Sequence, residues 1–352
     1  MKSNLNNKVE KQAENEFVGA AMELLNQLPE RTQDIFKKRF GLSGDFSALT
    51  LDKIGRDYGI TRERIRQIIA DFKKVLYKKR EEENFKKTED ILLCAIKENY
   101  DIIKKTDAIA KLNPQCLKQV ESAIKFLADC SEKILPFFEK GRIEKSWLAS
   151  APIKERALKF AAEAENIFQE EAEPLAEAEI VKRLMARFSG FSSKEILNYL
   201  KVLARVKKNK FGKWGMHHWP EISPGGSREK IYLVLKEEKK PLHFSRIAEL
   251  IDEYKLGKRK AHPQTIHNEL IKDKKFVLIG RGIYALSEWG YSEGVLKDVI
   301  KDILEKNGKP MKREEIIAEV LKARKVKKTT VIINLNNNKI FKRTGDLYGL
   351  KK

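Results

Sequence analysis

Four polar side chains, close together in the sequence, have the types and spacing that suit hydrogen bonding to DNA base edges. Arg62 and Arg66 are four residues apart, and so are Glu63 and Gln67, which puts each pair on neighbouring turns of one helix face. In the major groove, arginine donates to guanine, glutamate accepts from cytosine and glutamine pairs with adenine. The pattern therefore predicts a helix that reads bases through these four residues.

The surrounding residues predict how that helix is held. Its apolar residues recur at i, i+3, i+4 and i+7 and form one buried stripe, made of Ile65, Ile68, Ile69 and Phe72. Gly59 suits a left-handed turn before the helix, and Thr61 suits its N-cap. A preceding helix begins after Thr50, with its inward side formed by Leu51, Ile54 and Tyr58. Two helices joined by a short glycine-containing turn predict a helix-turn-helix.

Two long motifs in this part resemble a known family. "LPERTQDIFKKRFGL" (28–42) and "LTLDKIGRDYGITRERIRQI" (49–68) resemble the fourth conserved region of the primary bacterial sigma factors, over about residues 17–80. The resemblance implies that the helix docks on an upstream promoter element, with bases facing Arg62, Glu63, Arg66 and Gln67. It also implies phosphate contacts from Thr61, Arg64, Lys73 and Lys74.

The same resemblance implies a protein partner. Sigma factors use the helices before the helix-turn-helix to grip core RNA polymerase through a small apolar groove. Phe17 and Val18 begin the first expected helix, so we expect them to stay accessible to the polymerase. We find no counterpart of the sigma-factor helix that melts promoter DNA, and therefore expect that this chain does not open promoters by itself.

Composition supports a polyanionic partner. The 352-residue chain has a formal net charge of +21 and a pI near 9.6, and chains this basic commonly bind nucleic acid. No apolar run is long enough to span a bilayer, and residues 1–16 are polar, without a signal-peptide core. The three cysteines are expected to be reduced thiols in a cytoplasmic, nucleoid-associated protein without a membrane partner.

The remaining sequence contains a repeat of domain size. Three segments each show an apolar helix, a proline, two further helices and a short hairpin that contains an aromatic residue. The prolines are Pro174, Pro241 and Pro310, and the aromatic residues are Trp214, Tyr284 and Tyr348. Three helices plus a β-hairpin are typical of a winged helix, and we interpret the aromatic residues as core residues that close each wing.

One of these segments resembles a second family. "KPLHFSRIAELI", "TIHNEL" and "FVLIGRGIYALSEWG", between Lys230 and Gly290, resemble the HARE-type winged helix-turn-helix family, which includes a polymerase-associated delta subunit. Basic residues stand before the expected recognition helices and at a wing, where phosphate binding needs them. The candidate DNA contacts of the winged helices are Lys258, Arg259, Lys260, Thr265, Arg281, Lys327 and Lys328. Winged helices also dock on proteins, so both roles stay open.

We expect a mainly α fold in which a helix-turn-helix domain is followed by three or four winged-helix domains. The predicted parts are a disordered tail (1–16), the sigma-like domain (17–84), a helical region (85–150), a winged-helix-like domain (151–222), the HARE-type domain (226–292) and a last winged-helix-like domain (293–352). Region 85–150 reads either as a degenerate winged helix ending at Trp147 or as a plain helical linker.

Catalytic motifs are absent, so we expect neither an enzyme nor a cofactor. His217-His218 and the pair His262 and His267 lack partners at metal-ligand spacing, and we expect no metal.

The preferred interpretation is a transcription protein that binds double-stranded DNA and core RNA polymerase. Two alternatives remain: a polymerase accessory subunit that works by protein contacts, and a DNA-targeting component of a restriction or defence system.

Overall fold

The computed structural model describes residues 16–78, 82–291, 296–323, 328–336 and 340–351. The predicted disordered tail therefore lies almost entirely outside the described residues. The chain forms two compact units, Met1–Lys207 and Lys208–Lys352, and each is described by itself. Among the described helices, none is both long and apolar enough to cross a membrane.

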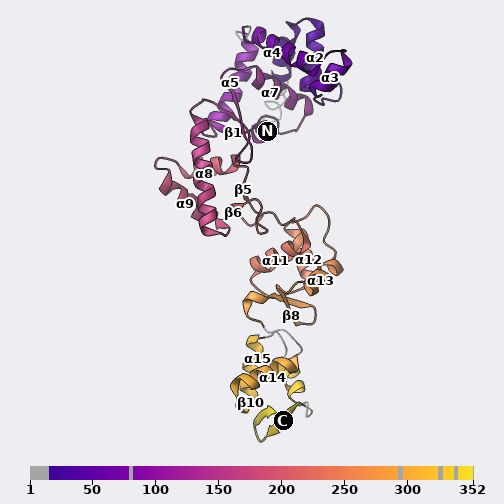
Figure 1. The fold of residues 1–352 in the computed structure, drawn as a ribbon, viewed down its shortest axis with the longest axis vertical. Coiled ribbons are helices and arrows are strands. Elements are labelled where there is room, and N and C mark those ends of the chain that lie inside the picture. Colours follow the sequence, from indigo (N-terminus) through magenta and orange to yellow (C-terminus); the bar gives the residue numbers. More distant parts are fainter. Residues whose placement is uncertain (1–15, 79–81, 292–295, 324–327, 337–339, 352) are drawn as a thin grey trace, which may run out of the picture. The chain divides into compact units, whose positions relative to one another are not determined.

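The first unit begins with the helix-turn-helix (Figure 1). A helix over residues 16–26 precedes α2 (Glu30–Phe40), α3 (Leu51–Asp57) and α4 (Arg62–Lys78). Thr50 caps α3, because its side-chain oxygen accepts from the backbone N–H of Lys53. The predicted stripe of α4 faces inward, with Ile65 and Ile69 buried and Ile68 and Phe72 half-buried.

The next part of the first unit alternates helices with short strands. Its elements are α5 (Glu83–Lys97), β1 (Ile102–Lys104), α6 (Lys105–Leu112), α7 (Lys118–Cys130), β2 (Leu135–Glu139) and β3 (Ile143–Leu148). They form a three-stranded sheet in the order β1-β3-β2, in which both pairs are antiparallel. Strands β2 and β3 form a hairpin, which fits the winged-helix interpretation of region 85–150 better than a plain helical linker, and Trp147 in β3 is buried.

The elements that follow are α8 (Ile153–Glu171), β4 (Leu175–Ala176), α9 (Glu177–Arg187), α10 (Ser193–Val202), β5 (Val206–Lys208) and β6 (Lys213–Met216). Ser192 caps α10 by accepting from the backbone N–H of Glu195. The division between the two compact units falls inside β5. Trp214 of β6 is buried, as the sequence predicts.

The second unit repeats the same element order twice. The HARE-like segment contains α11 (Ser227–Glu238), β7 (Leu242–His243), α12 (Phe244–Glu253), α13 (Pro263–Lys272), β8 (Phe276–Gly280), β9 (Ile283–Leu286) and a short 3-10 turn, η1 (Ser287–Trp289). The last segment contains α14 (Leu296–Asn307), β10 (Met311–Lys312), α15 (Arg313–Ala323), α16 (Lys328–Leu335), β11 (Phe341–Thr344) and β12 (Leu347–Leu350). Each has its own core and a three-stranded sheet, ordered β7-β9-β8 and β10-β12-β11.

Each repeated segment contains a short strand that the sequence analysis does not predict. In three segments it pairs with the strand that carries the aromatic residue: Ile103 faces Trp147, Leu242 faces Tyr284 and Met311 faces Tyr348. These aromatic residues are buried, which confirms their predicted place in the core. A strand of two or three residues is too short to show an alternating pattern. Pro174, Pro241 and Pro310 each stand directly before such a strand, namely β4, β7 and β10.

The hydrophobic core of the first unit does not end at residue 84, where the sequence analysis places a domain boundary. One cluster of buried residues runs from Phe17 to Trp147 and includes side chains of the helix-turn-helix, α5 and α7. The ring of Phe126 in α7 lies 6.0 Å from the ring of Phe36 and 5.2 Å from that of Phe40. On either side of that boundary, α4 extends to Lys78 and α5 begins at Glu83. The helix-turn-helix is therefore packed on region 85–150.

The shared core predicts that a change in α7 destabilises the helix-turn-helix. Phe126→Ala removes a fully buried ring, and we expect it to lower the free energy of unfolding by about 3–5 kcal/mol. Phe138→Ala is the matched control, since that ring is 55% exposed. Hydrogen exchange should show faster exchange of the α2 amides in the first variant alone. Unchanged α2 exchange in Phe126→Ala would mean that the two parts fold separately.

Candidate nucleic-acid interface

The first half of α4 presents the predicted base-reading residues to solvent. Arg62, Glu63, Arg66 and Gln67 are all exposed. Thr61 caps the helix, since its hydroxyl oxygen accepts from the backbone N–H of Arg64 at 3.1 Å. Gly59 has a φ of +65°, which is the left-handed turn that the sequence predicts. The helix start and its reading face are therefore placed by the same short turn.

These exposed side chains are paired with one another. The Arg66 guanidinium donates to both carboxylate oxygens of Glu63, at 2.6 to 3.0 Å, and Arg64 donates to the Gln67 side chain at 3.3 Å. The hydrogen bond from Arg66 lowers the pKa of the Glu63 carboxyl, so Glu63 is an acceptor at neutral pH. Ion pairs between exposed side chains contribute little stability. Breaking these pairs therefore costs little free energy.

A hydrogen-bonded cluster joins α2 to the end of α3. The Tyr58 hydroxyl donates to Asp34, and Lys38 forms an ion pair with the same carboxylate at 2.9 Å. Lys38 also lies 4.9 Å from the centre of the Tyr58 ring, in a cation–π contact. Hydrogen bonds from Tyr58 and Lys38 lower the pKa of Asp34. These contacts hold the two helices that support α4.

The predicted phosphate contacts fall in two different environments. Thr61, which precedes α4, and Arg64 and Lys74 on α4 are exposed, and Lys74 has an acidic neighbour in Asp71 at 3.7 Å. Lys73 differs, because its ammonium forms an ion pair with Asp129 of α7 and its side chain is only 21% exposed. Lys73 therefore lies at the junction of the helix-turn-helix and α7.

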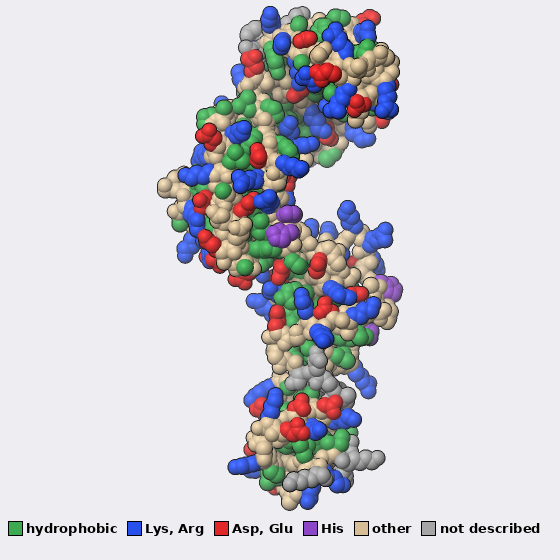
Figure 2. Space-filling model, in the orientation of Figure 1, with side chains coloured by type: hydrophobic (Ala, Val, Ile, Leu, Met, Phe, Trp, Pro, Cys, Tyr) green, Lys and Arg blue, Asp and Glu red, His purple; other side chains and the backbone are tan. Residues whose placement is uncertain are grey.

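The candidate residues of the HARE-like segment are exposed. Lys258, Arg259 and Lys260 lie in the loop between α12 and α13, Thr265 lies on α13 and Arg281 lies at the turn between β8 and β9. In the last segment Lys328 is exposed at the start of α16, and Lys327 lies outside the described residues. Figure 2 shows Lys and Arg side chains spread over the visible face of each segment.

In the 151–222 segment, the third helix is α10, the helix that occupies the place of the expected recognition helix. One face of α10 packs against the preceding segment. Asn198 of α10 donates to the backbone oxygens of Asn99 and Ile102, at 2.5 and 2.8 Å, and Tyr199 is fully buried. The basic residues that follow are also paired, Arg205 with Glu165 at 3.2 Å and Lys207 with Glu144. The covered face of α10 thus makes a protein contact with the preceding segment.

Phe17 is not accessible, in contrast to the sequence expectation. Its side chain is 1% exposed and belongs to the core, and Val18 is half-buried against the same core. Phe17 packs in one cluster with side chains of α2, α4, α5 and α7, and α5 lies against the first helix, where Lys87 forms an ion pair with Glu16 at 2.7 Å and Asn84 donates to Glu23 at 2.7 Å. A partner that binds this part of the chain cannot use the Phe17 ring as its anchor while this packing persists.

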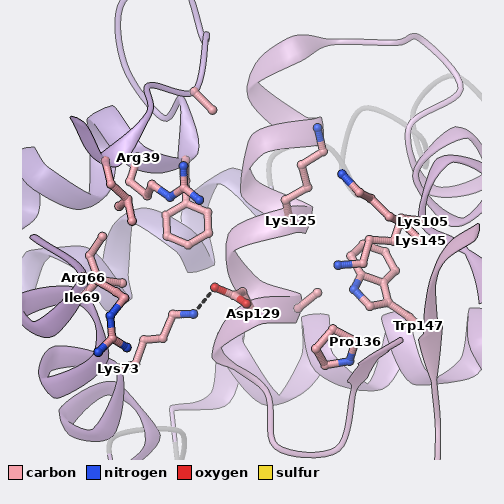
Figure 3. A pocket seen from close by; sticks show the side chains of 14 residues that line it. Arg39, Arg66, Ile69, Lys73, Lys105, Lys125, Asp129, Pro136, Lys145 and Trp147 are labelled. Atoms are coloured by element: carbon pink, nitrogen blue, oxygen red, sulfur yellow. Dashed lines mark hydrogen bonds and ion pairs between the residues drawn. The ribbon is translucent and has the colours of Figure 1, made fainter. Parts of the chain in front are cut away.

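A basic groove is the feature that the sequence analysis missed. A cavity of about 660 Å³ lies between the helix-turn-helix and region 85–150. Figure 3 shows Arg39, Arg66, Ile69 and Lys73 on one side of it and Lys105, Lys125, Lys145 and Trp147 on the other. These residues are scattered along the sequence, and only the packing of α7 on the helix-turn-helix brings them together.

Within the described ranges, no group of three or more His, Cys, Asp or Glu side chains is arranged to hold a metal ion.

Comparison with known proteins confirms both resemblances. Residues 24–72 match the family model described as Sigma-70, region 4. Residues 228–289 match the HARE-HTH model, whose description includes ASXL proteins and a restriction endonuclease HTH domain. Both families are DNA-binding, and the two matches indicate a DNA-binding protein.

Curated relatives match over a short part of their length. The chain is 42% identical over 71 residues to the RNA polymerase sigma factor SigA of Clostridium acetobutylicum, which is 20% of this chain and 18% of the relative. It is 49% identical over 45 residues to the sigma factor RpoD of Helicobacter pylori, covering 13% and 7% of the two chains. The principal sigma factor HrdD of Streptomyces griseus is 48% identical over 46 residues, covering 13% and 14%.

The tight approach of the two helices of the motif gives a direct test of the fold. A Cβ atom at Gly55 would lie 2.6 Å from the backbone oxygen of Ile60, so Gly55→Ala must displace the turn. We expect a loss of about 1–3 kcal/mol in unfolding free energy and weaker DNA binding. Gly19→Ala is the control, because nothing lies within 4 Å of that position and alanine favours a helix. Equal melting temperatures for the two variants would contradict the packing described here.

Proposed function

We propose that this chain is a transcription protein that docks on a promoter-type DNA site through α4 and does not melt the duplex by itself. The observation that carries the proposal is the exposed cluster of Arg62, Glu63, Arg66 and Gln67 on a helix-turn-helix that matches sigma-70 region 4. Their side-chain types suit guanine, cytosine and adenine edges. The proposal is limited to docking because the sigma factors match this chain only over the segment that contains the helix-turn-helix.

We also propose that the chain carries four winged-helix domains behind the sigma-like motif. In support, the order helix, short strand, two helices and two strands occurs from α5 to β3, from α8 to β6, from α11 to β9 and from α14 to β12. The exposed basic loop 258–260 and Arg281 then serve as phosphate contacts of the HARE-like domain. The covered helix α10 serves instead as a structural joint.

Core RNA polymerase is the proposed protein partner, and the bacterial nucleoid the proposed location. The support is that the matched relatives are named RNA polymerase sigma factors. A role as an accessory subunit that works mainly by protein contacts is the second candidate. It is favoured by exposed apolar side chains on the HARE-like domain, where Ile271 is 64% and Leu278 46% exposed.

Base reading by α4 predicts an effect on sequence preference. We expect Arg66→Ala and Glu63→Ala each to weaken binding to the site selected by the full chain by roughly tenfold or more and to relax preference at one base pair. Lys74→Ala on the same helix is the comparison, and should weaken all duplexes alike. Selection of binding sites followed by affinity measurements on mismatched duplexes distinguishes the two effects. An unchanged preference in Arg66→Ala would rule out the proposed docking.

The polymerase proposal predicts binding without strand opening. The full chain should bind core RNA polymerase in a pull-down and place it on a duplex that contains the selected site. Permanganate footprinting of that complex should reveal no reactive thymines, whereas a complete sigma factor with its own promoter serves as the positive control. Reactive thymines with this protein would show a melting activity, and absence of polymerase binding would leave a free-standing DNA-binding regulator.

A further inference from the structure

The groove beside α4 is large, open and strongly basic. Its walls carry six cationic side chains: Arg39, Arg66, Lys73, Lys105, Lys125 and Lys145. A single carboxylate, Asp129, lies among the residues that line it. Figure 3 shows Asp129 between the two walls, where it is joined to Lys73. The one acid that could neutralise the groove is therefore already engaged.

The remaining cations are incompletely neutralised. Arg66 and Lys125 pair with carboxylates outside the groove lining, Glu63 and Glu121. Lys105 and Lys145 have no carboxylate partner within the described part of the chain. Lys105 instead places its ammonium 5.5 Å from the centre of the Trp147 ring. An anion that entered here would meet lysines from α6, α7 and β3 at once.

Holding these lysines together is electrostatically unfavourable. Burial lowers the pKa of the Lys105 ammonium, Asp129 opposes that change, and the like charges of Lys145, Lys125 and Lys73 lower the pKa further. A half-buried ammonium among like charges is stabilised by any anion that binds between them. The cluster thus has the properties of a binding surface for negative charge.

The groove borders the base-reading face of α4. Arg62, Arg66, Ile69 and Lys73 are separated by four, three and four residues, so they lie along one stripe of the helix. Arg66 belongs both to the predicted reading set and to the groove wall. A duplex that places its major groove on Arg66 must carry its flanking phosphates past this stripe, toward the lysines on the opposite wall.

We propose that this groove binds the phosphodiester backbone of the DNA duplex next to the base pairs read by α4. The proposal rests on the proposed function and extends it, since it adds Lys105, Lys125 and Lys145 to the DNA interface. A series of phosphates fits the site because the cations are spread over a groove of about 660 Å³ and not gathered around one point. The region behind the sigma-like motif then contributes affinity without contributing base preference.

The test compares two triple variants of the full chain. The groove variant carries Lys105→Gln, Lys125→Gln and Lys145→Gln. The control variant carries Lys97→Gln, Lys159→Gln and Lys182→Gln, which removes the same charge from exposed positions of the same unit that do not line the groove. Affinity for a duplex with the selected site and long flanks is measured across a range of salt concentrations. Thermal unfolding of each variant accompanies the measurement, and Lys145→Gln alone is included because that side chain is exposed and its loss leaves the core unchanged.

Each lost phosphate contact reduces the slope of log affinity against log salt by about 0.9. We expect the groove variant to lose about two to three units of slope, the single Lys145→Gln variant about one, and the control variant less than one. Shortening the duplex flanks should weaken the wild-type chain and leave the groove variant unchanged. Base preference should persist in both triple variants, because the reading residues of α4 are retained.

A slope in the groove variant equal to that of the control overturns the inference. So does an unchanged slope together with weaker binding to core RNA polymerase, which would assign the groove to an acidic protein surface. Retained base preference with an unchanged slope refutes the groove alone. A wild-type chain without base preference whose slope still falls on groove substitution refutes the α4 docking alone, and a wild-type chain that does not bind DNA refutes both.

Discussion

The packing of α7 against the helix-turn-helix is the contact on which the rest of the first unit depends. Phe126 meets Phe36 and Phe40, and the buried cluster continues without a break from Phe17 to Trp147. The four short helices of residues 16–78 have little apolar surface to bury by themselves. The contact with α7 supplies the missing surface, and it also brings the lysines of region 85–150 beside the face of α4 that carries Arg66.

The helix ends, the turn before α4 and the buried side of α4 could be predicted from the sequence, because neighbouring residues determine them. The caps Thr50 and Thr61, the left-handed Gly59 and the inward stripe of α4 all occur as predicted. The wing aromatic residues are also buried as expected. In each case neighbouring residues determine the conformation, through side-chain caps, glycine torsion angles or apolar periodicity.

The tertiary contacts could not be predicted, because no short pattern encodes them. Phe17 is predicted to be an accessible apolar residue at a helix start, but it is buried in a core shared with helices as distant in the sequence as α7. Lys73 reads as a phosphate contact, but its partner Asp129 is on α7. The groove has the same origin, since its cations come from separate elements whose proximity follows only from packing. The four residues predicted to read bases are the exception, since all four lie on one helix, α4.

The aromatic contact between α7 and α2 also bears on how such a chain can change over generations. A segment that covers a fifth of the chain resembles sigma factors, as expected of a domain that can be transferred between proteins. It is not freely exchangeable, because Phe36, Phe40 and Phe126 complete each other's packing. A substitution at one of the three favours compensation at the others, so these positions should covary among homologues. Recombination between residues 78 and 83 would separate two halves of one core and leave both unstable.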